Sequence, residues 1–180
     1  TIDDVKAGKV DGAWVGARVF DTVGVNSFQA LLAPLLVDSQ ELQGKVFEAG
    51  IPNQMMAGLE KVDLAGIGVL PGPMRKILGV AKPYLAPNDF SGSIVGIQAS
   101  GVATKTFSTL GARVRAVPSG RSALQGLDAY EQQLASIAGN QFAGSAKYVT
   151  GNINFWPRPL VLFTSHRCRL PYAGAAEPVA

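Results

Sequence analysis

The sequence has few of the residues on which metal sites and many catalytic sites depend. It contains one cysteine, Cys168, and one histidine, His166, among 180 residues. A lone cysteine excludes an internal disulfide and a zinc site built from several cysteines. A lone histidine leaves a Ser-His-Asp arrangement with one candidate base, and His166 lies in a basic stretch near the C-terminus. We therefore expect no metal site, no cofactor and no enzyme activity.

Charged residues are also scarce, at 16% of the chain, whereas hydrophobic residues make up 47%. This composition is typical of a well-buried globular protein, because disordered chains combine low hydrophobicity with high charge. The formal net charge is +3, and many of the arginines form two loose groups, within residues 113–121 and 158–169. A nucleic-acid-binding face needs a denser basic stripe than this. We therefore expect no nucleic-acid partner.

Long hydrophobic runs are absent as well. No stretch of about eighteen uninterrupted apolar residues occurs, so the sequence predicts no membrane-spanning helix. The chain begins at Thr1, without methionine and without the charged and then apolar start of a signal peptide. We expect an N-terminus that is either processed or truncated.

Glycine and proline are plentiful, with 21 and 11 residues, and they punctuate the chain throughout. Their spacing predicts short elements joined by tight turns. Hydrophobic periodicity predicts strands at 13–16, 64–70, 94–99 and 113–117, and helices at 1–7, 52–61, 100–110 and 131–142. Strands that alternate with helices of this length indicate βαβ units, hence an α/β fold with largely parallel sheets.

Two similar turns stand out, Gly8-Lys-Val-Asp-Gly12 and Gly126-Leu-Asp-Ala129, each after a short helix-like stretch. Around the second turn lie further segments in a fixed order: 89–92 (Asp-Phe-Ser-Gly), 94–98, 109–112 (Thr-Leu-Gly-Ala) and 123–125. In order and spacing, these segments resemble the extracytoplasmic solute receptors of TRAP-type transporters, the DctP-like family. The resemblance covers roughly residues 5 to 165.

The resemblance implies a type II periplasmic-binding-protein fold, with two α/β lobes and parallel or mixed sheets. We expect a partial first lobe at 1–91, a second lobe at 92–148, a return segment at 149–165 and an atypical tail at 166–180. Because the family members are longer at both ends, the first lobe is expected to be incomplete. An incomplete lobe exposes a sheet edge, which favours an oligomer through that lobe.

The family's D-L-x-G-x-x-I-R motif opens the second lobe, and its arginine clamps a ligand carboxylate. Here Gly96 stands where that arginine belongs. Arg115, on the next predicted strand, is the candidate replacement, and a solvated edge arginine is the alternative. By resemblance to the family's V-D-G-x-E-N turn, Glu131 holds the turn and Gln132 reaches the ligand with its amide. The alternative for both residues is an ordinary helix start.

Trp14, Arg18 and Phe20 follow the first turn. Residues at the carboxyl ends of parallel strands line the cleft of open α/β sheets. Arg18 is therefore a candidate cation for the ligand, and Trp14 and Phe20 are candidates for an aromatic wall. Core packing is the alternative for the two aromatic residues.

The return segment contributes Asn152, Asn154 and Trp156, which strand alternation places on one face. Two amides and an indole at a cleft would suit a polar organic ligand. The alternative is a hinge strand whose amides face solvent.

The predicted function is capture of a small organic, anionic solute between two lobes and its delivery to TRAP-type membrane transporter subunits. This predicts a periplasmic or extracellular location, with a membrane anchor as a further option. One alternative is the receptor of an ABC importer, because the arginine at position 96 is missing. Others are the effector-sensing domain of a transcription regulator and an α/β enzyme that uses the same fold.

Overall fold

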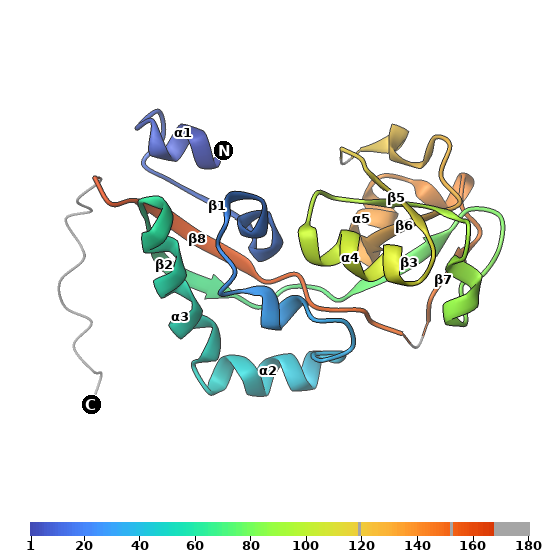
Figure 1. The fold of residues 1–180 in the computed structure, drawn as a ribbon, viewed down its shortest axis with the longest axis horizontal. Helices are drawn as coiled ribbons and strands as arrows, with labels where there is room; N and C mark the ends of the chain where they lie inside the picture. The colour runs from blue at the N-terminus through green and yellow to red at the C-terminus, as the bar shows by residue number, and fades with distance from the viewer. Residues whose placement is uncertain (119, 152, 168–180) are drawn as a thin grey trace.

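The computed structural model describes residues 1–118, 120–151 and 153–167, which form two lobes around two separate sheets (Figure 1). The first lobe contains a three-stranded sheet in the order β1-β8-β2. Its strands are β1 (Gly12–Gly16), β8 (Leu160–Ser165) and β2 (Leu64–Leu70), and both pairings are antiparallel. The first and the last described strands therefore lie side by side, so both ends of the described chain belong to this lobe.

The second lobe contains a five-stranded sheet in the order β5-β4-β6-β3-β7. Its strands are β3 (Arg75–Gly79), β4 (Ile94–Ile97), β5 (Arg113–Ala116), β6 (Ala129–Gln133) and β7 (Tyr148–Val149). Strands β5, β4 and β6 are parallel, whereas β3 pairs antiparallel with both β6 and β7. The α/β fold is thus confirmed, but its sheets are mixed or antiparallel where periodicity predicted largely parallel ones.

Helical segments are short throughout the described chain. The α-helices are α1 (Ile2–Lys6), α2 (Gln40–Glu48), α3 (Ile51–Met55), α4 (Gly101–Thr109) and α5 (Leu134–Gly139). The 3₁₀ segments are η1 (Ala17–Val23), η2 (Gln29–Leu32), η3 (Met56–Val62), η4 (Pro87–Phe90), η5 (Arg121–Leu124) and η6 (Phe142–Gly144). The two longest α-helices begin after serine caps, where Ser39 accepts from the Leu42 N–H and Ser100 from the Ala103 N–H, each at 3.2 Å.

The helix that we predicted over 131–142 is divided in the structure. Residues 129–133 form strand β6, and only 134–139 are α-helical. Strand β6 lies between β4 and β3 and is buried along most of its length. Pairing on both sides supplies hydrogen bonds that the local helical pattern does not anticipate, so tertiary context overrides propensity here.

The chain crosses from the first lobe to the second between Leu70 and Arg75, because β3 already belongs to the second sheet. This is about twenty residues earlier than the boundary that we predicted at residue 91. It returns between Val149 and Leu160. The two crossing segments touch at a bridge between Met74 and Pro157. The lobes are therefore joined by two segments that lie next to each other, as a hinge requires.

Each lobe has its own aromatic core. In the first lobe, Phe20 packs against Phe28 and edge-on against Phe163, with centroids 5.6 and 5.3 Å apart. In the second lobe, Phe107 of α4 is fully buried against Phe155, at 5.3 Å, and other aromatic rings. Polar and charged side chains between these two cores form the candidate site.

Candidate functional site

A cluster of buried charged and amide side chains lies where the two lobes meet. Arg18 follows β1 in the first lobe, Arg75 begins β3, and Glu131 and Gln132 lie on β6. The exposed fractions of these four side chains are at most 3%. Because a buried charge is costly unless it is paired, each must be held by the others. The cluster is the densest concentration of ionic groups in the interior of the described chain.

Glu131 accepts a two-pronged contact from Arg75. The Arg75 Nη2 lies 2.7 Å from Glu131 Oε2, and Arg75 Nε donates to Oε1. The same Nη2 also bonds the Glu131 carbonyl oxygen at 2.9 Å, and Nη1 donates to Gln132 Oε1 at 2.7 Å. This is the planar, bidentate geometry that suits a guanidinium and a carboxylate. Arg75 therefore fixes Glu131 and Gln132 from the neighbouring strand.

Arg18 reaches the same carboxylate from the first lobe. Its Nη1 lies 2.9 Å from Glu131 Oε2, and its Nη2 donates to the side-chain oxygen of Gln98. Gln98 lies directly after β4 in the second lobe. The ion pair joins residues 113 positions apart in the chain. Arg18 thus links the two lobes.

A second contact between the lobes comes from η1, the 3₁₀ segment that also contains Arg18. Asp21 accepts a hydrogen bond from Ser100 Oγ at 2.8 Å and one from the Val102 N–H at 3.3 Å. Both donors lie at the N-terminus of α4, where a carboxylate interacts favourably with the helix dipole. Segment η1 therefore docks on the second lobe through one cation, Arg18, and one anion, Asp21.

The charged groups in the cluster change each other's pKa values. Burial by itself would raise the pKa of Glu131, but the charges of Arg75 and Arg18 outweigh it and lower the pKa to about 2. Burial lowers the pKa of Arg18 to about 10, against the raising effect of Glu131, and the nearby charge of Arg75 lowers it further. Both groups remain ionised at neutral pH, so the cluster carries fixed charges.

The lowered pKa of Glu131 predicts that stability decreases in acid. The unfolded chain takes up a proton near the ordinary pKa of 4.5, whereas the folded chain stays ionised down to about 2. The ionised Glu131 therefore contributes on the order of 3 kcal/mol to the free energy of unfolding above pH 4.5. This contribution is lost as the pH falls toward 2. Urea unfolding at several pH values between 6 and 2.5 measures it. The Glu131→Gln protein should lose less stability over this window, and parallel curves would contradict the assignment.

Two residues that we predicted to contact the ligand lie instead in the cores. Phe20 is fully buried among Phe28 and Phe163, so it does not form the expected aromatic wall. Trp156 is 2% exposed and packs on Phe107 with centroids 5.9 Å apart. In both cases the large apolar side chain is buried where it removes the most surface from water.

Trp14 is 59% exposed on β1, an edge strand of the first sheet, and is not buried in the cluster. Asn154 donates to the Asp38 carbonyl oxygen at 2.6 Å and ties the return segment to the first lobe. Asn152 lies outside the described residues. Phe155 and Trp156 are consecutive and both buried, so both faces of this part of the return segment are covered.

Arg115 does not replace the arginine that is missing at position 96. It is exposed on the edge strand β5 and donates to the Gln125 carbonyl oxygen. A side chain at Gly96 would overlap Leu127 and come within 3.2 Å of Tyr130. Core side chains therefore fill the space beside Gly96, and the cationic groups of the junction come from other positions.

Sequence reasoning missed Arg75 and Gln98. Arg75 opens a strand whose five residues are all buried, and a charge at the edge of such an apolar run is the signal that could have identified it. Gln98 had no comparable signal, because its role depends on where η1 packs. Only the spatial arrangement shows that these two residues surround Arg18 and Glu131.

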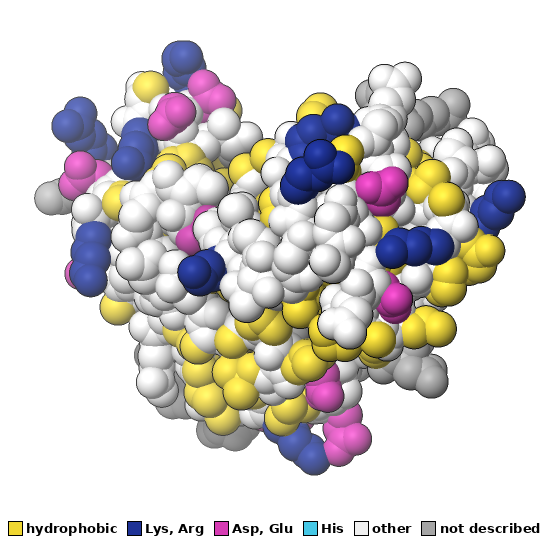
Figure 2. Space-filling view, turned by 45° about the vertical axis from the view of Figure 1, so that its right-hand side comes forward, with side chains coloured by type: hydrophobic (Ala, Val, Ile, Leu, Met, Phe, Trp, Pro, Cys, Tyr) yellow, Lys and Arg dark blue, Asp and Glu magenta, His cyan; other side chains and the backbone are white. Residues whose placement is uncertain are grey.

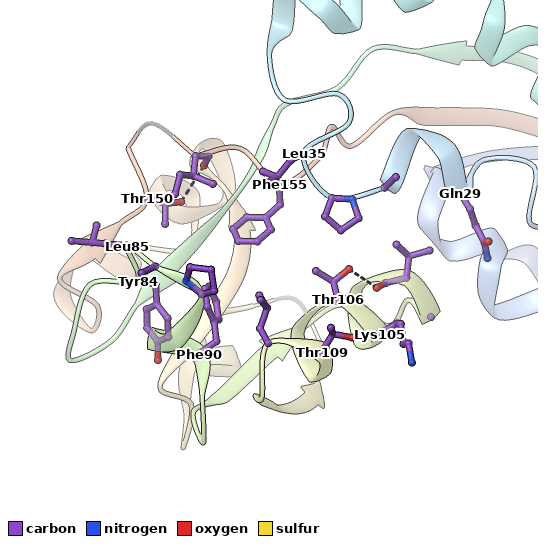
Figure 3. A pocket seen from close by; sticks show the side chains of 18 residues that line it. Gln29, Leu35, Tyr84, Leu85, Phe90, Lys105, Thr106, Thr109, Thr150 and Phe155 are labelled. Carbon is purple, nitrogen blue, oxygen red and sulfur yellow. Dashed lines mark hydrogen bonds between the residues drawn. The ribbon is translucent and has the colours of Figure 1, made fainter.

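A large cavity lies elsewhere, between η2 of the first lobe and α4 of the second (Figure 3). It encloses about 850 Å³ and is lined mainly by apolar groups such as Leu35, Leu85, Phe90 and Phe155. Figure 2 shows hydrophobic side chains gathered on the lower part of the face in view. The lining of the cavity includes one charged residue, Lys105. The guanidinium groups of the arginine cluster suit an anion better than this apolar lining does.

Within the described residues, no group of three or more His, Cys, Asp or Glu side chains comes together to hold a metal ion. The same part of the chain contains no helix long and apolar enough to cross a membrane.

Comparisons with known proteins found a family model and similar solved structures. No curated protein matches the chain. Among solved structures, it is similar to a TRAP periplasmic solute-binding protein of a Bradyrhizobium species, in complex with galacturonate, with a TM-score of 0.81 and 24% identity. It is also similar to a TRAP periplasmic solute-binding protein of Pseudomonas aeruginosa with bound L-malate, with a TM-score of 0.82 and 20% identity. For the sugar acid binding protein of Advenella mimigardefordensis, in complex with galactonate, the TM-score is 0.80 and the identity is 20%.

Each alignment covers 92% of this chain, but only 56%, 58% and 54% of the respective relative. The chain thus spans little more than half the length of these proteins. The model of the DctP family, described as bacterial extracellular solute-binding protein family 7, matches residues 1–166. This is a family of solute-binding proteins, and it lends no support to the regulator or enzyme alternatives. The chain therefore belongs to family 7 of the bacterial extracellular solute-binding proteins, the DctP family.

Proposed function

We propose that this protein captures an organic acid between its two lobes and presents it to the membrane subunits of a TRAP-type transporter. The observation that carries the proposal is the excess of buried positive charge at the junction. Arg18 and Arg75 both pair with one carboxylate, that of Glu131, so one positive charge remains uncompensated within this group. A carboxylate ligand would supply the missing negative charge.

The geometry suggests how binding and closure are coupled. A guanidinium carries five N–H donors, and the contacts of Arg18 with Glu131 and Gln98 use only part of this set. The remaining donors are available to oxygens of a solute. Because Arg18 belongs to the first lobe and its partners to the second, a ligand at this point favours the closed arrangement.

The relatives suggest which anions to test, since they were solved with galacturonate, L-malate and galactonate. We expect at least one of these three anions to raise the unfolding temperature of this chain. A ligand at a hundred times its dissociation constant adds about 2.7 kcal/mol of stability. For a chain of this size, that corresponds to a rise of roughly 5–10 °C.

A fluorescence titration can follow the same event. Trp14 is exposed, whereas Trp156, which belongs to the return segment, is buried in the core of the second lobe. In a Trp14→Phe protein, Trp156 is the single tryptophan and reports on closure. Neutral galactose controls for the anionic group.

The Arg18→Ala protein should bind about tenfold more weakly, and Arg113→Ala, which removes an exposed arginine of β5, should bind as before. If no organic acid shifts either signal, the proposed function is wrong.

Delivery to a transporter implies a location outside the cytoplasm, which family membership supports. The oligomer that we expected through the first lobe stays a prediction. Light scattering coupled to size-exclusion chromatography would test it. We expect twice the mass of one chain, and the mass of a single chain would contradict the prediction.

A further inference from the structure

A third arginine lies beside the cluster and is not used by the contacts described above. Arg158 belongs to the return segment, and its backbone N–H donates to the Pro73 carbonyl oxygen at 3.0 Å. The carbonyl oxygen of the following residue, Pro159, accepts from the N–H of Ala17 at 2.8 Å. Arg158 is therefore held at the point where the two crossing segments meet the first lobe.

The register of the crossing segments directs this side chain toward the cluster. Met74 and Pro157 face each other in an antiparallel bridge, and the Arg75 N–H donates to the Trp156 carbonyl oxygen. Because side chains alternate along extended segments and paired residues share a face, Arg158 lies on the same face as Arg75. Arg158 is partly buried, and burial lowers its pKa; the nearby charge of Arg75 lowers this pKa further, whereas that of Glu131 raises it.

A glycine of the first lobe makes room for the guanidinium. If Gly16 carried a Cβ atom, that atom would lie 3.3 Å from Arg158 Nε and 3.7 Å from its Cζ. The side chain of Arg158 therefore rests against the backbone at the end of β1, one residue before η1 begins. The guanidinium is thus placed between the first lobe, which supplies Arg18, and the crossing segments, which supply Arg75.

The contacts recorded for residues 1–118, 120–151 and 153–167 include no hydrogen bond or ion pair of the Arg158 guanidinium. Arg18 and Arg75 are thus already bonded to the one carboxylate of this group, that of Glu131, whereas Arg158 is not. A half-buried arginine that lacks a carboxylate partner retains its full capacity to bind an anion.

We propose that Arg158 is the cationic anchor for the carboxylate of the organic acid. This inference rests on the proposed function and adds the residue that binds the charged end of the solute. It also accounts for the glycine at position 96, because the anion is then held from the return segment, and strand β4 needs no arginine.

The test compares the parent chain with Arg158→Ala, Arg158→Lys and the control Arg113→Ala by isothermal titration calorimetry. The probes are sodium galacturonate, sodium galactonate and sodium L-malate, each at 50 and 300 mM NaCl. We expect Arg158→Ala to weaken binding by roughly tenfold or more and to reduce the salt dependence of the dissociation constant. Arg158→Lys should be intermediate, since it keeps the charge and loses the planar fork. Arg113→Ala should match the parent.

A Gly16→Ala protein provides a second route in case Arg158→Ala does not fold. Gly16 has φ −62° and ψ 135°, which alanine adopts without strain, and its Cβ atom, 3.3 Å from Arg158 Nε, would shift the Arg158 side chain by a few tenths of an ångström. We expect weaker binding and an unchanged circular dichroism spectrum. If the parent binds an acid and the Arg158 and Gly16 variants bind it equally well, the anchor is wrong and the proposed function stands. If the parent binds none of the three acids, the proposed function fails, and the anchor fails with it.

Discussion

Replacing Glu131 with alanine is expected to destabilise the protein by about 3–5 kcal/mol, since removing one partner of a buried ion pair leaves the others uncompensated. Glu131 is fully buried, and both Arg18 and Arg75 depend on it. Without the carboxylate, two guanidinium groups would remain close together in a site with little solvent. Such a loss is a large part of the total stability of a domain.

Urea unfolding followed by circular dichroism measures this loss. The matched control is Glu41→Ala, which breaks the pair between Glu41 and Lys45, 2.7 Å apart on the exposed surface of α2. Surface pairs contribute little, so this variant should unfold close to the parent. Equal, small effects of the two substitutions would mean that the buried cluster contributes no more than a surface pair, and would contradict its role in holding the lobes together.

Replacing Phe107 with alanine should cost about 3–5 kcal/mol, as large-to-small changes of buried aromatic residues do. Phe107 is fully buried on α4, and its ring contacts those of Phe90, Phe155 and Trp156 at 5.7, 5.3 and 5.9 Å. Two of these partners belong to the return segment. The substitution therefore creates a cavity and also loosens the segment that carries the chain back to the first lobe.

The same denaturation experiment applies to Phe107→Ala, with Leu85→Ala as control. Leu85 is 72% exposed, so its truncation should change the stability by no more than about 0.5 kcal/mol. The fluorescence of Trp156 gives a second reading, because its indole loses a neighbour and gains access to water. Unfolding of Phe107→Ala at the urea concentration of the parent would show that this aromatic cluster is not the core of the second lobe.

Much of the fold could be predicted from local sequence. Strand β2 at 64–70 agrees with the prediction to the residue, and β4, β5 and α4 agree to within two residues at each end. In these segments the apolar periodicity, the serine cap and the terminating glycine all favour the same structure. Segment 129–133 was predicted wrongly, because its polar residues, Glu131 to Gln133, read as an exposed helix start, while pairing with β3 and β4 makes them a buried strand.

The candidate site was only partly predictable. Arg18, Glu131 and Gln132 were identified as candidates, and the structure brings them together. Arg115 was proposed because it lies on the next predicted strand, but the order of strands along the chain does not give the position of that strand in the sheet. Because β5 is an edge strand, Arg115 lies away from the junction, whereas Arg75, on an inner strand, lies within it.

The sequence by itself determined the family, the α/β class and the absence of multi-cysteine and multi-histidine chemistry, because these follow from composition and from the order of local motifs. Tertiary structure alone decided which charges meet. Arg18, Arg75 and Glu131 are separated by 56 residues or more along the chain, and no local pattern relates them. Burial makes an unpaired charge too costly, so the packing of the two lobes selects the partners, and with them the place where an anion can bind.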